Sequence, residues 1–229
     1  MRTIQQFWKL AAVAVIALAS TLASTVTQAQ LTVGKDYQAI TPPQPTPPGK
    51  NIEVLEFFWY ACPHCSQLQP SLQAWLKNKP ADVAFRSQPA AFDESWAQLG
   101  RAFYAVETIG AMDKLHPEIF AAIHKTKKLD PKVLVKDPKS LFAWVGTQGV
   151  DAKKFTDAYN SFSVVSKANR LVDTTSAYGV SGTPSIAVDG RYLIAPAMVP
   201  MKSNAIDYAQ FFKNVDQLIA MARANRKGK

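Results

Sequence analysis

Residues 56–65 read Glu-Phe-Phe-Trp-Tyr-Ala-Cys-Pro-His-Cys, and this stretch decides the fold. From Asn51 to Trp59 apolar residues occupy both alternating faces, which predicts a strand buried on both sides of a sheet. The Cys-x-x-Cys pair that follows opens a helical pattern with a proline at its first position. The chain is therefore expected to place its only two cysteines, Cys62 and Cys65, at the start of a helix that leaves a buried strand.

A helix start stabilises a thiolate, because its first backbone N–H groups have no intrahelical partners and the end carries a partial positive charge. Cys62 is therefore expected to have a lowered pKa. Pro63 stiffens the dipeptide between the sulfurs, and His64 adds a donor or a cation near Cys62. Cys65 shares a helix face with leucines that follow it, so we expect it to be the less exposed sulfur that resolves mixed disulfides.

Other roles of the cysteine pair fit the spacing less well. Structural zinc needs four ligands, and the three histidines of the chain do not supply a second ligand pair. A c-type haem needs histidine directly after the second cysteine, where Ser66 stands. A purely structural disulfide between Cys62 and Cys65 would close so few residues that it removes little entropy from the unfolded chain. We therefore expect a redox-active disulfide, no metal site and no bound cofactor.

Residues 56–65, with Cys-Pro-His-Cys at their end, resemble the active-site segment of the DsbA-type thiol:disulfide oxidoreductases of the thioredoxin superfamily. The likeness extends over nearly all of the chain after residue 30. It implies an α/β thioredoxin fold interrupted by an inserted all-helical domain, and an enzyme that donates a disulfide to newly exported proteins in the periplasm. It also implies re-oxidation by a membrane quinone-linked oxidoreductase of the DsbB type. We expect a monomer that acts on reduced exported polypeptides and binds no nucleic acid.

Residues 179–184, Gly-Val-Ser-Gly-Thr-Pro, are the second informative stretch, because a proline that opens a strand marks an edge or a special turn. The resemblance implies that Pro184 is cis and lies against the dithiol, with Thr183 pairing its backbone with an extended substrate. The best-known DsbA proteins have Val before this proline, whereas Thr is also met in disulfide isomerases. An isomerase or reductase of the same fold therefore stays open, as does, from another class, a redox-inert peptide-binding module or chaperone.

Glu56 lies inside the predicted buried strand, where a charged carboxylate is unfavourable. It either reaches an edge and water as an inert surface residue, or is held with a raised pKa and a polar partner. In the second case the resemblance implies that Glu56 moves a proton on or off Cys65 as the mixed disulfide resolves. His116 and His124 are expected to be surface residues at helix ends.

The chain begins with a pattern typical of a secretory signal peptide, namely Arg2 and Lys9, an apolar run to Ala19, and small residues up to Ala29. We expect export and cleavage after Ala29, with an uncleaved anchor as the alternative. The net charge of +9 falls to +7 without Arg2 and Lys9. The basic end, residues 223–229, is expected to be solvated or to lie at a membrane surface rather than to bind nucleic acid.

Helical spacing and helix breakers predict the remaining elements. The active-site helix is expected over 63–77 and a short strand over 82–88, followed by helices that start at the N-cap Asp93. Later elements are helical pieces at 117–125, 138–145 and 151–159, a long helix over 164–178, a hairpin turn at Asp189-Gly190, and a last helix over 204–222. The predicted domains are 1–29 (signal peptide), 30–50 (Pro-rich lead-in), 51–92 (first part of the thioredoxin domain), 93–163 (helical insertion), 164–222 (second part of the thioredoxin domain) and 223–229 (basic tail).

Overall fold

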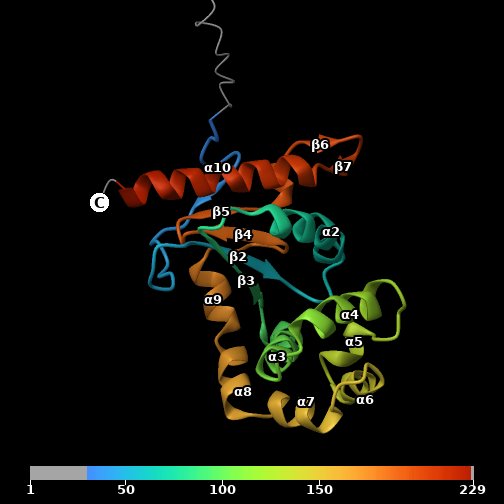
Figure 1. The fold of residues 1–229 in the computed structure, drawn as a ribbon. Coiled ribbons are helices and arrows are strands. Elements are labelled where there is room, and N and C mark those ends of the chain that lie inside the picture. Colours follow the sequence, from blue (N-terminus) through green and yellow to red (C-terminus); the bar gives the residue numbers. More distant parts are fainter. Residues whose placement is uncertain (1–29, 228–229) are drawn as a thin grey trace, which may run out of the picture. The chain divides into compact units, whose positions relative to one another are not determined.

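A five-stranded sheet in the order β1-β5-β4-β2-β3 forms the centre of the fold (Figure 1). The computed structural model describes residues 30–227, so the predicted signal peptide, 1–29, and the last two residues lie outside the described part. The strands are β1 (Gln38–Ala39), β2 (Ile52–Phe58), β3 (Val83–Pro89), β4 (Ser185–Val188) and β5 (Tyr192–Ile194).

Strand β2 lies inside the sheet, where it pairs in parallel with β3 and antiparallel with β4. All seven of its residues are buried, as the apolar residues on both of its faces predict. The register places Glu56 opposite Ser87 of β3 on one side and Ile186 of β4 on the other. The carboxyl end of β2 leads directly into the Cys-x-x-Cys pair.

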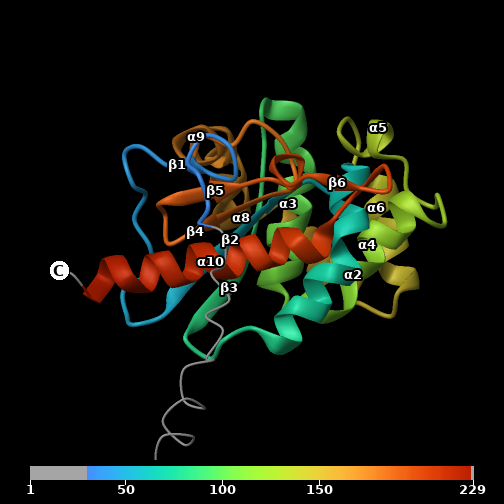
Figure 2. The same cartoon turned by 90° about the horizontal axis from the view of Figure 1, so that it is seen from above.

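Different parts of the chain cover the two faces of the sheet. α2 (Pro63–Asn78) and α10 (Tyr208–Lys227) lie on the same face (Figures 1 and 2). Leu68 of α2 and Phe211 of α10 belong to the same buried cluster as the sheet residues of that face. Phe57 is on the opposite face, which is covered by the chain that leads into β4. The buried residues of α10 confirm the predicted amphipathic last helix, whose apolar residues pack inward.

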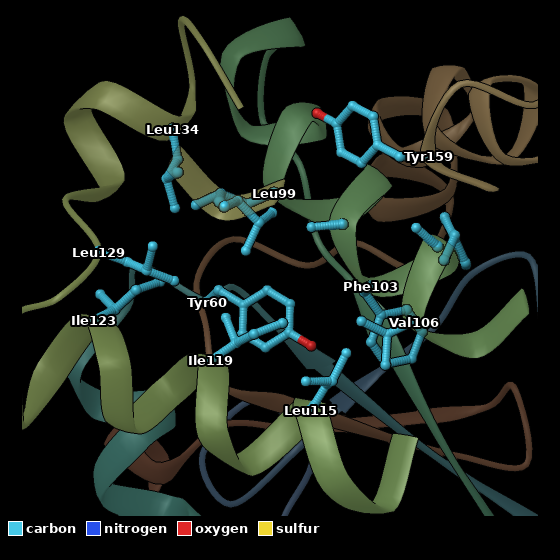
Figure 3. Close-up of a cluster of buried hydrophobic side chains, with 14 of the residues drawn as sticks. Tyr60, Leu99, Phe103, Val106, Leu115, Ile119, Ile123, Leu129, Leu134 and Tyr159 are labelled. Carbon is cyan, nitrogen blue, oxygen red and sulfur yellow. The ribbon is translucent and has the colours of Figure 1, made fainter. Parts of the chain in front are cut away.

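The secondary structure between β3 and β4 consists of helices alone, which confirms the predicted α/β fold interrupted by helices. Their buried cluster is formed mainly by α3 and α4, and Tyr60 projects into it (Figure 3). Because Tyr60 belongs to the turn between β2 and α2, the helical region packs directly on the segment that precedes Cys62. The helices are α3 (Glu94–Thr108), α4 (Met112–His124), α5 (Pro131–Leu134), α6 (Lys139–Thr147), α7 (Ala152–Tyr159), α8 (Phe162–Asn169) and α9 (Leu171–Ala177).

Three of the predicted helices differ in extent from the observed ones. The helix predicted over 117–125 already begins at Met112 and continues through Pro117, so that proline does not mark its start. The predicted helix over 164–178 is two helices, α8 and α9, with only Arg170 between them. A break of one residue keeps the apolar positions in helical spacing, so the pattern could not reveal it. The last helix begins at Tyr208, later than predicted, because β6 (Met201–Lys202) and β7 (Ala205–Ile206) form a hairpin whose two turn residues have positive φ.

The basic end of the chain continues α10, so the prediction of a separate tail over 223–229 is wrong for the described residues. Arg223 donates to both carboxylate oxygens of Asp82 at 2.6 Å, and Arg226 pairs with Asp189 in the β4–β5 turn. These ion pairs tie the end of α10 to the sheet. No helix within the described residues is both long enough and apolar enough to cross a membrane.

The turn between β4 and β5 has left-handed backbone at Asp189 and Gly190, with φ of 55° and 62°, as the hairpin signal predicts. Gln44 of the Pro-rich lead-in donates its backbone N–H to the Gly190 carbonyl at 2.8 Å. A Cβ on Gly190 would lie 2.1 Å from the backbone oxygen of Gln44. Glycine is therefore needed here both for the backbone conformation and for the close approach of the lead-in.

We predict that Gly190→Ala destabilises the protein by about 2–4 kcal/mol, because alanine must adopt positive φ and displace the Gln44 backbone. Gly179→Ala is the matched control, since Gly179 has a φ of 66° and open space where a Cβ would stand. It should cost only about 1–2 kcal/mol. Urea unfolding of both variants measures the difference, and equal losses would show that the contact with Gln44 is unimportant.

Candidate active site

Cys62 immediately precedes α2, and Pro63 is the first residue of that helix. The Cys62 N–H donates to the Trp59 carbonyl at 3.0 Å, which closes the turn that leaves β2. The Cys62 carbonyl accepts from the Ser66 N–H at 3.2 Å and so starts the helix. Cys62 is 8% exposed and Cys65 is fully buried, which is the predicted order of exposure.

The surroundings of Cys62 lower its pKa from 9.0 to about 5. The largest cause is a hydrogen bond from the Cys65 side chain, which outweighs the opposing effect of burial. The Thr183 side chain and the backbone N–H groups of Cys65 and His64 lower the pKa further. The backbone contribution is the expected effect of a helix start. His64 acts on Cys62 through its backbone, while its exposed ring hydrogen bonds to Gln67 at 3.2 Å.

The pKa of Cys65 moves in the opposite direction, to well above 9.0. Burial is the largest cause, and the neighbouring Cys62 and the charge of Glu56 raise the pKa further. At neutral pH Cys65 is therefore a protonated thiol that donates to the Cys62 thiolate. The pair combines one ionised, reactive sulfur with one buried sulfur that holds its proton.

The loop before β4 lies against Cys62. The Thr183–Pro184 peptide bond is cis, as the resemblance implied. The Cys62 Sγ lies 3.2 Å from the Thr183 carbonyl oxygen, to which it donates in its thiol form. The Ser185 hydroxyl donates to the Gly182 carbonyl at 2.8 Å and fixes the loop from inside. The fold thus brings the two informative stretches of the sequence together.

Glu56 is fully buried in β2, so the alternative of an inert surface carboxylate is wrong. Burial raises the pKa of Glu56 to about 7, against smaller lowering effects of hydrogen bonds from the Ser87 hydroxyl at 2.9 Å and the Gln69 amide at 3.3 Å. Because the charge of Glu56 raises the pKa of Cys65, the two groups influence each other's protonation. Glu56 is therefore the titratable neighbour of the buried sulfur.

We predicted that His116 and His124 are surface residues. This is wrong for His116, which is buried on α4, whereas His124 at the end of α4 is half-buried. The Nδ1 of His116 lies 2.8 Å from the Tyr60 hydroxyl, and the Nε2 of His124 lies 2.7 Å from the Tyr60 carbonyl. Burial lowers the pKa of His116 to about 4, so its ring is neutral at pH 7. α4 therefore holds Tyr60 by both its side chain and its backbone. Among residues 30–227, no three His, Cys, Asp or Glu side chains are arranged to hold a metal ion.

Comparisons with known proteins agree with this geometry. A family model described as Thioredoxin matches residues 51–217. The thiol:disulfide interchange protein DsbA of Bordetella parapertussis is 38% identical over 217 residues, which cover 95% of this chain and 97% of that protein. The DsbA of Pseudomonas aeruginosa PAO1 is 36% identical over 180 residues, covering 78% and 82%. This chain belongs to the DsbA family. It is a thiol:disulfide oxidoreductase of the thioredoxin superfamily.

Solved DsbA structures share the fold. The crystal structure of Pseudomonas aeruginosa DsbA matches with a TM-score of 0.75 and 32% identity, covering 86% of this chain and 97% of that chain. DsbA from Xylella fastidiosa matches with a TM-score of 0.73 and 29% identity, covering 85% and 98%. These matches confirm the thioredoxin fold with an inserted helical domain.

We predict that alkylation of the reduced protein by iodoacetamide follows the ionisation of Cys62, with its midpoint near pH 5. The rate should rise about tenfold per pH unit below the midpoint and level off above it. Mass spectrometry after timed quenching between pH 3 and pH 9 measures this. Cys65→Ala should raise the midpoint, because it removes the strongest hydrogen bond to the thiolate, and Cys62→Ser should leave only the slow, buried thiol. A wild-type midpoint at pH 8 or above would contradict the assignment.

We further predict that Glu56→Gln removes a loss of stability that wild type shows as the pH rises through about 7. A raised folded-state pKa gives stability that is full below the unfolded value, 4.5, and is lost as the carboxyl ionises in the folded protein. As the pH rises from 5 to 8, the free energy of unfolding of the variant should increase by roughly 2–3 kcal/mol relative to that of wild type.

Urea unfolding of the oxidised proteins is the measurement, because the disulfide removes the two thiols from the titration. Glu118→Gln, which alters an exposed carboxyl, is the control and should parallel wild type. If the free energies of unfolding of wild type and Glu56→Gln changed in the same way with pH, the raised pKa of Glu56 would be contradicted.

Proposed function

We propose that this protein donates a Cys62–Cys65 disulfide to newly exported polypeptides. The observation that supports this direction is the opposite shift of the two thiol pKa values, which favours one thiolate in the reduced protein. A disulfide has no thiol to ionise, so stabilising the Cys62 thiolate stabilises only the reduced form. The oxidised form then takes up electrons more readily and is the better oxidant.

In the first step an extended substrate lies along Thr183–Pro184, where the Thr183 carbonyl oxygen is 3.2 Å from the Cys62 Sγ. A substrate thiolate attacks the Cys62 sulfur, forming a mixed disulfide and breaking the Cys62–Cys65 bond. The electron pair of that bond leaves with Cys65. Because the pKa of Cys65 is raised, its sulfur takes up a proton, and Glu56 is the nearby carboxyl that we assign as the donor.

In the second step another substrate thiolate attacks the substrate sulfur of the mixed disulfide and releases Cys62. Cys62 is a good leaving group, because its low pKa makes the departing thiolate stable. The substrate has lost two thiols and gained a disulfide, and Cys62 and Cys65 are both reduced. Pro63 and His64 serve this step by fixing the helix start and by the His64 backbone N–H at the sulfur.

The remaining assignments rest on the sequence and on membership of the DsbA family. We place the protein in the periplasm, exported by a cleaved signal peptide over 1–29, where substrate disulfides persist. Re-oxidation then needs an acceptor for two electrons, and a membrane quinone-linked oxidoreductase of the DsbB type is the partner we assign. We propose a monomer that uses no cofactor of its own and binds no nucleic acid.

We predict that the oxidised protein oxidises a reduced dithiol peptide with a stoichiometry of one, the peptide losing two thiols as the protein gains two. Equilibration with glutathione buffers should show Cys62 and Cys65 mostly reduced where glutathione is half oxidised by thiol count. Thiol trapping and mass spectrometry report both quantities.

Cys62→Ser should abolish peptide oxidation, whereas a redox-inert peptide-binding module would keep its activity in that variant. A pair that stays oxidised in reducing glutathione buffers, with a Cys62 pKa near 9, would favour the isomerase or reductase instead. Either result would overturn the proposed donor function.

A further inference from the structure

The segment that joins α4 to α5, together with the first two residues of α5, is strongly basic. Residues 125–132 read Lys-Thr-Lys-Lys-Leu-Asp-Pro-Lys, and four lysines against one aspartate give this segment a net charge of +3. Arg2, Lys9 and Lys229 lie outside the described residues. The described part of the chain therefore has 23 basic and 17 acidic residues, which give a net charge of +6. Half of the net charge of the described residues therefore lies in eight consecutive positions.

All four lysines of this segment are exposed, whereas Leu129 is buried and anchors the segment to the helices below it. Leu129 is 2% exposed and lies beside Ile123 on the flank of Tyr60 (Figure 3). The Leu129 N–H also donates to the Ala122 carbonyl of α4 at 3.2 Å. Within residues 30–227, none of these lysines forms a salt bridge. The segment is fixed in place while its charges stay available.

The lysine segment shares a groove with the chain neighbours of Cys62. A groove of about 490 Å³ is lined by Ala61 and Pro63, the two neighbours of Cys62, and on its other side by Lys127 and Lys132. A second groove of about 1070 Å³ also includes Pro63 and Lys127 and continues between α2 and α4. Both views of the fold place the α4–α5 segment beside the start of α2 (Figures 1 and 2). The residues on either side of Cys62 in the chain therefore border a basic, partly apolar groove.

We propose that the lysine segment, residues 125–132, is a substrate-selecting surface that favours polypeptides with acidic residues next to the reactive cysteine. The inference rests on the proposed donor function and adds a class of preferred substrate to it. A cationic rim raises the local concentration of acidic segments and their association rate, and lysine stems add apolar contact in the groove. Because the lysines are exposed and three of them line grooves that reach Pro63, they act on the approach of the substrate and leave the sulfur chemistry unchanged.

The test uses three reduced dithiol peptides that differ only in the three residues flanking the first cysteine, which are Asp, Ser or Lys. Stopped-flow measurement gives the second-order rate constant for reduction of the oxidised protein by each peptide. At about 10 mM salt, where screening extends over about 30 Å, wild type should oxidise the Asp peptide at least about 10-fold faster than the Lys peptide. At about 1 M salt, where the screening length is about 3 Å, the ratio should fall towards one.

The triple variant Lys125→Gln, Lys127→Gln and Lys132→Gln removes the lysines that line the two grooves and should lower the low-salt ratio at least threefold. Its matched control, Lys77→Gln, Lys154→Gln and Lys213→Gln, removes the same charge from exposed lysines that line neither groove, and it should keep most of the wild-type ratio. All three proteins should oxidise the Ser peptide at similar rates.

Equal ratios in the two triple variants would overturn the proposal, because they would assign the preference to net charge alone. The proposal would also be overturned if the lysine replacements changed only co-sedimentation with phosphatidylglycerol vesicles and left the peptide ratios unchanged. Oxidation of the Ser peptide reports separately on the donor function, so a failed charge preference leaves that function standing.

Discussion

A thiolate at Cys62 persists at neutral pH because the Cys65 thiol, the Thr183 side chain and two backbone N–H groups donate to it. These donors come from the active-site helix and from the loop before β4, so both parts of the fold contribute to the stability of the thiolate. A lowering of the pKa from 9.0 to about 5 corresponds to roughly 3 kcal/mol of stability for the folded reduced protein at pH 7. Since the folded-state pKa is depressed, this stability is complete above the unfolded value and is lost as the pH falls through about 5.

The buried carboxyl of Glu56 has the opposite effect on how stability depends on pH. Its raised pKa means that it contributes stability at low pH and loses it through about pH 7, so Glu56 and Cys62 titrate with opposite effects. An ionised Glu56 also makes it harder for Cys65 to lose its proton, because its charge raises the pKa of that thiol. A carboxyl that is unfavourable to bury therefore stands where a proton must be exchanged with a buried sulfur. Its hydrogen bonds to Ser87 and Gln69 hold it there.

The sequence was informative where local chemistry dictates the structure, as in the apolar strand, the proline at the helix start, and the Asp93 cap, which accepts from two backbone N–H groups of α3. It was uninformative where distant residues meet. The spacing of His116 and His124 puts them on one face of α4, but nothing near them in sequence indicates that Tyr60 is their partner. The Arg223 pair with Asp82 joins residues 141 positions apart and could not be read from a basic end of the chain. The Cys65 hydrogen bond to Cys62 depends on the geometry of the first helical turn.

Cys62 is positioned from two sides that belong to different parts of the fold. The sheet supplies Thr183 through the loop before β4, and the helical insertion supplies α4, which holds Tyr60 by two hydrogen bonds. The lysine segment, residues 125–132, follows the last residue of α4, so one helix both fixes the turn before Cys62 and sets the charge beside it. The contacts that fix the turn are largely buried, whereas the four lysines are exposed. Exposed charges can change with little effect on packing, so this surface can be altered while the thiolate and its donors stay the same.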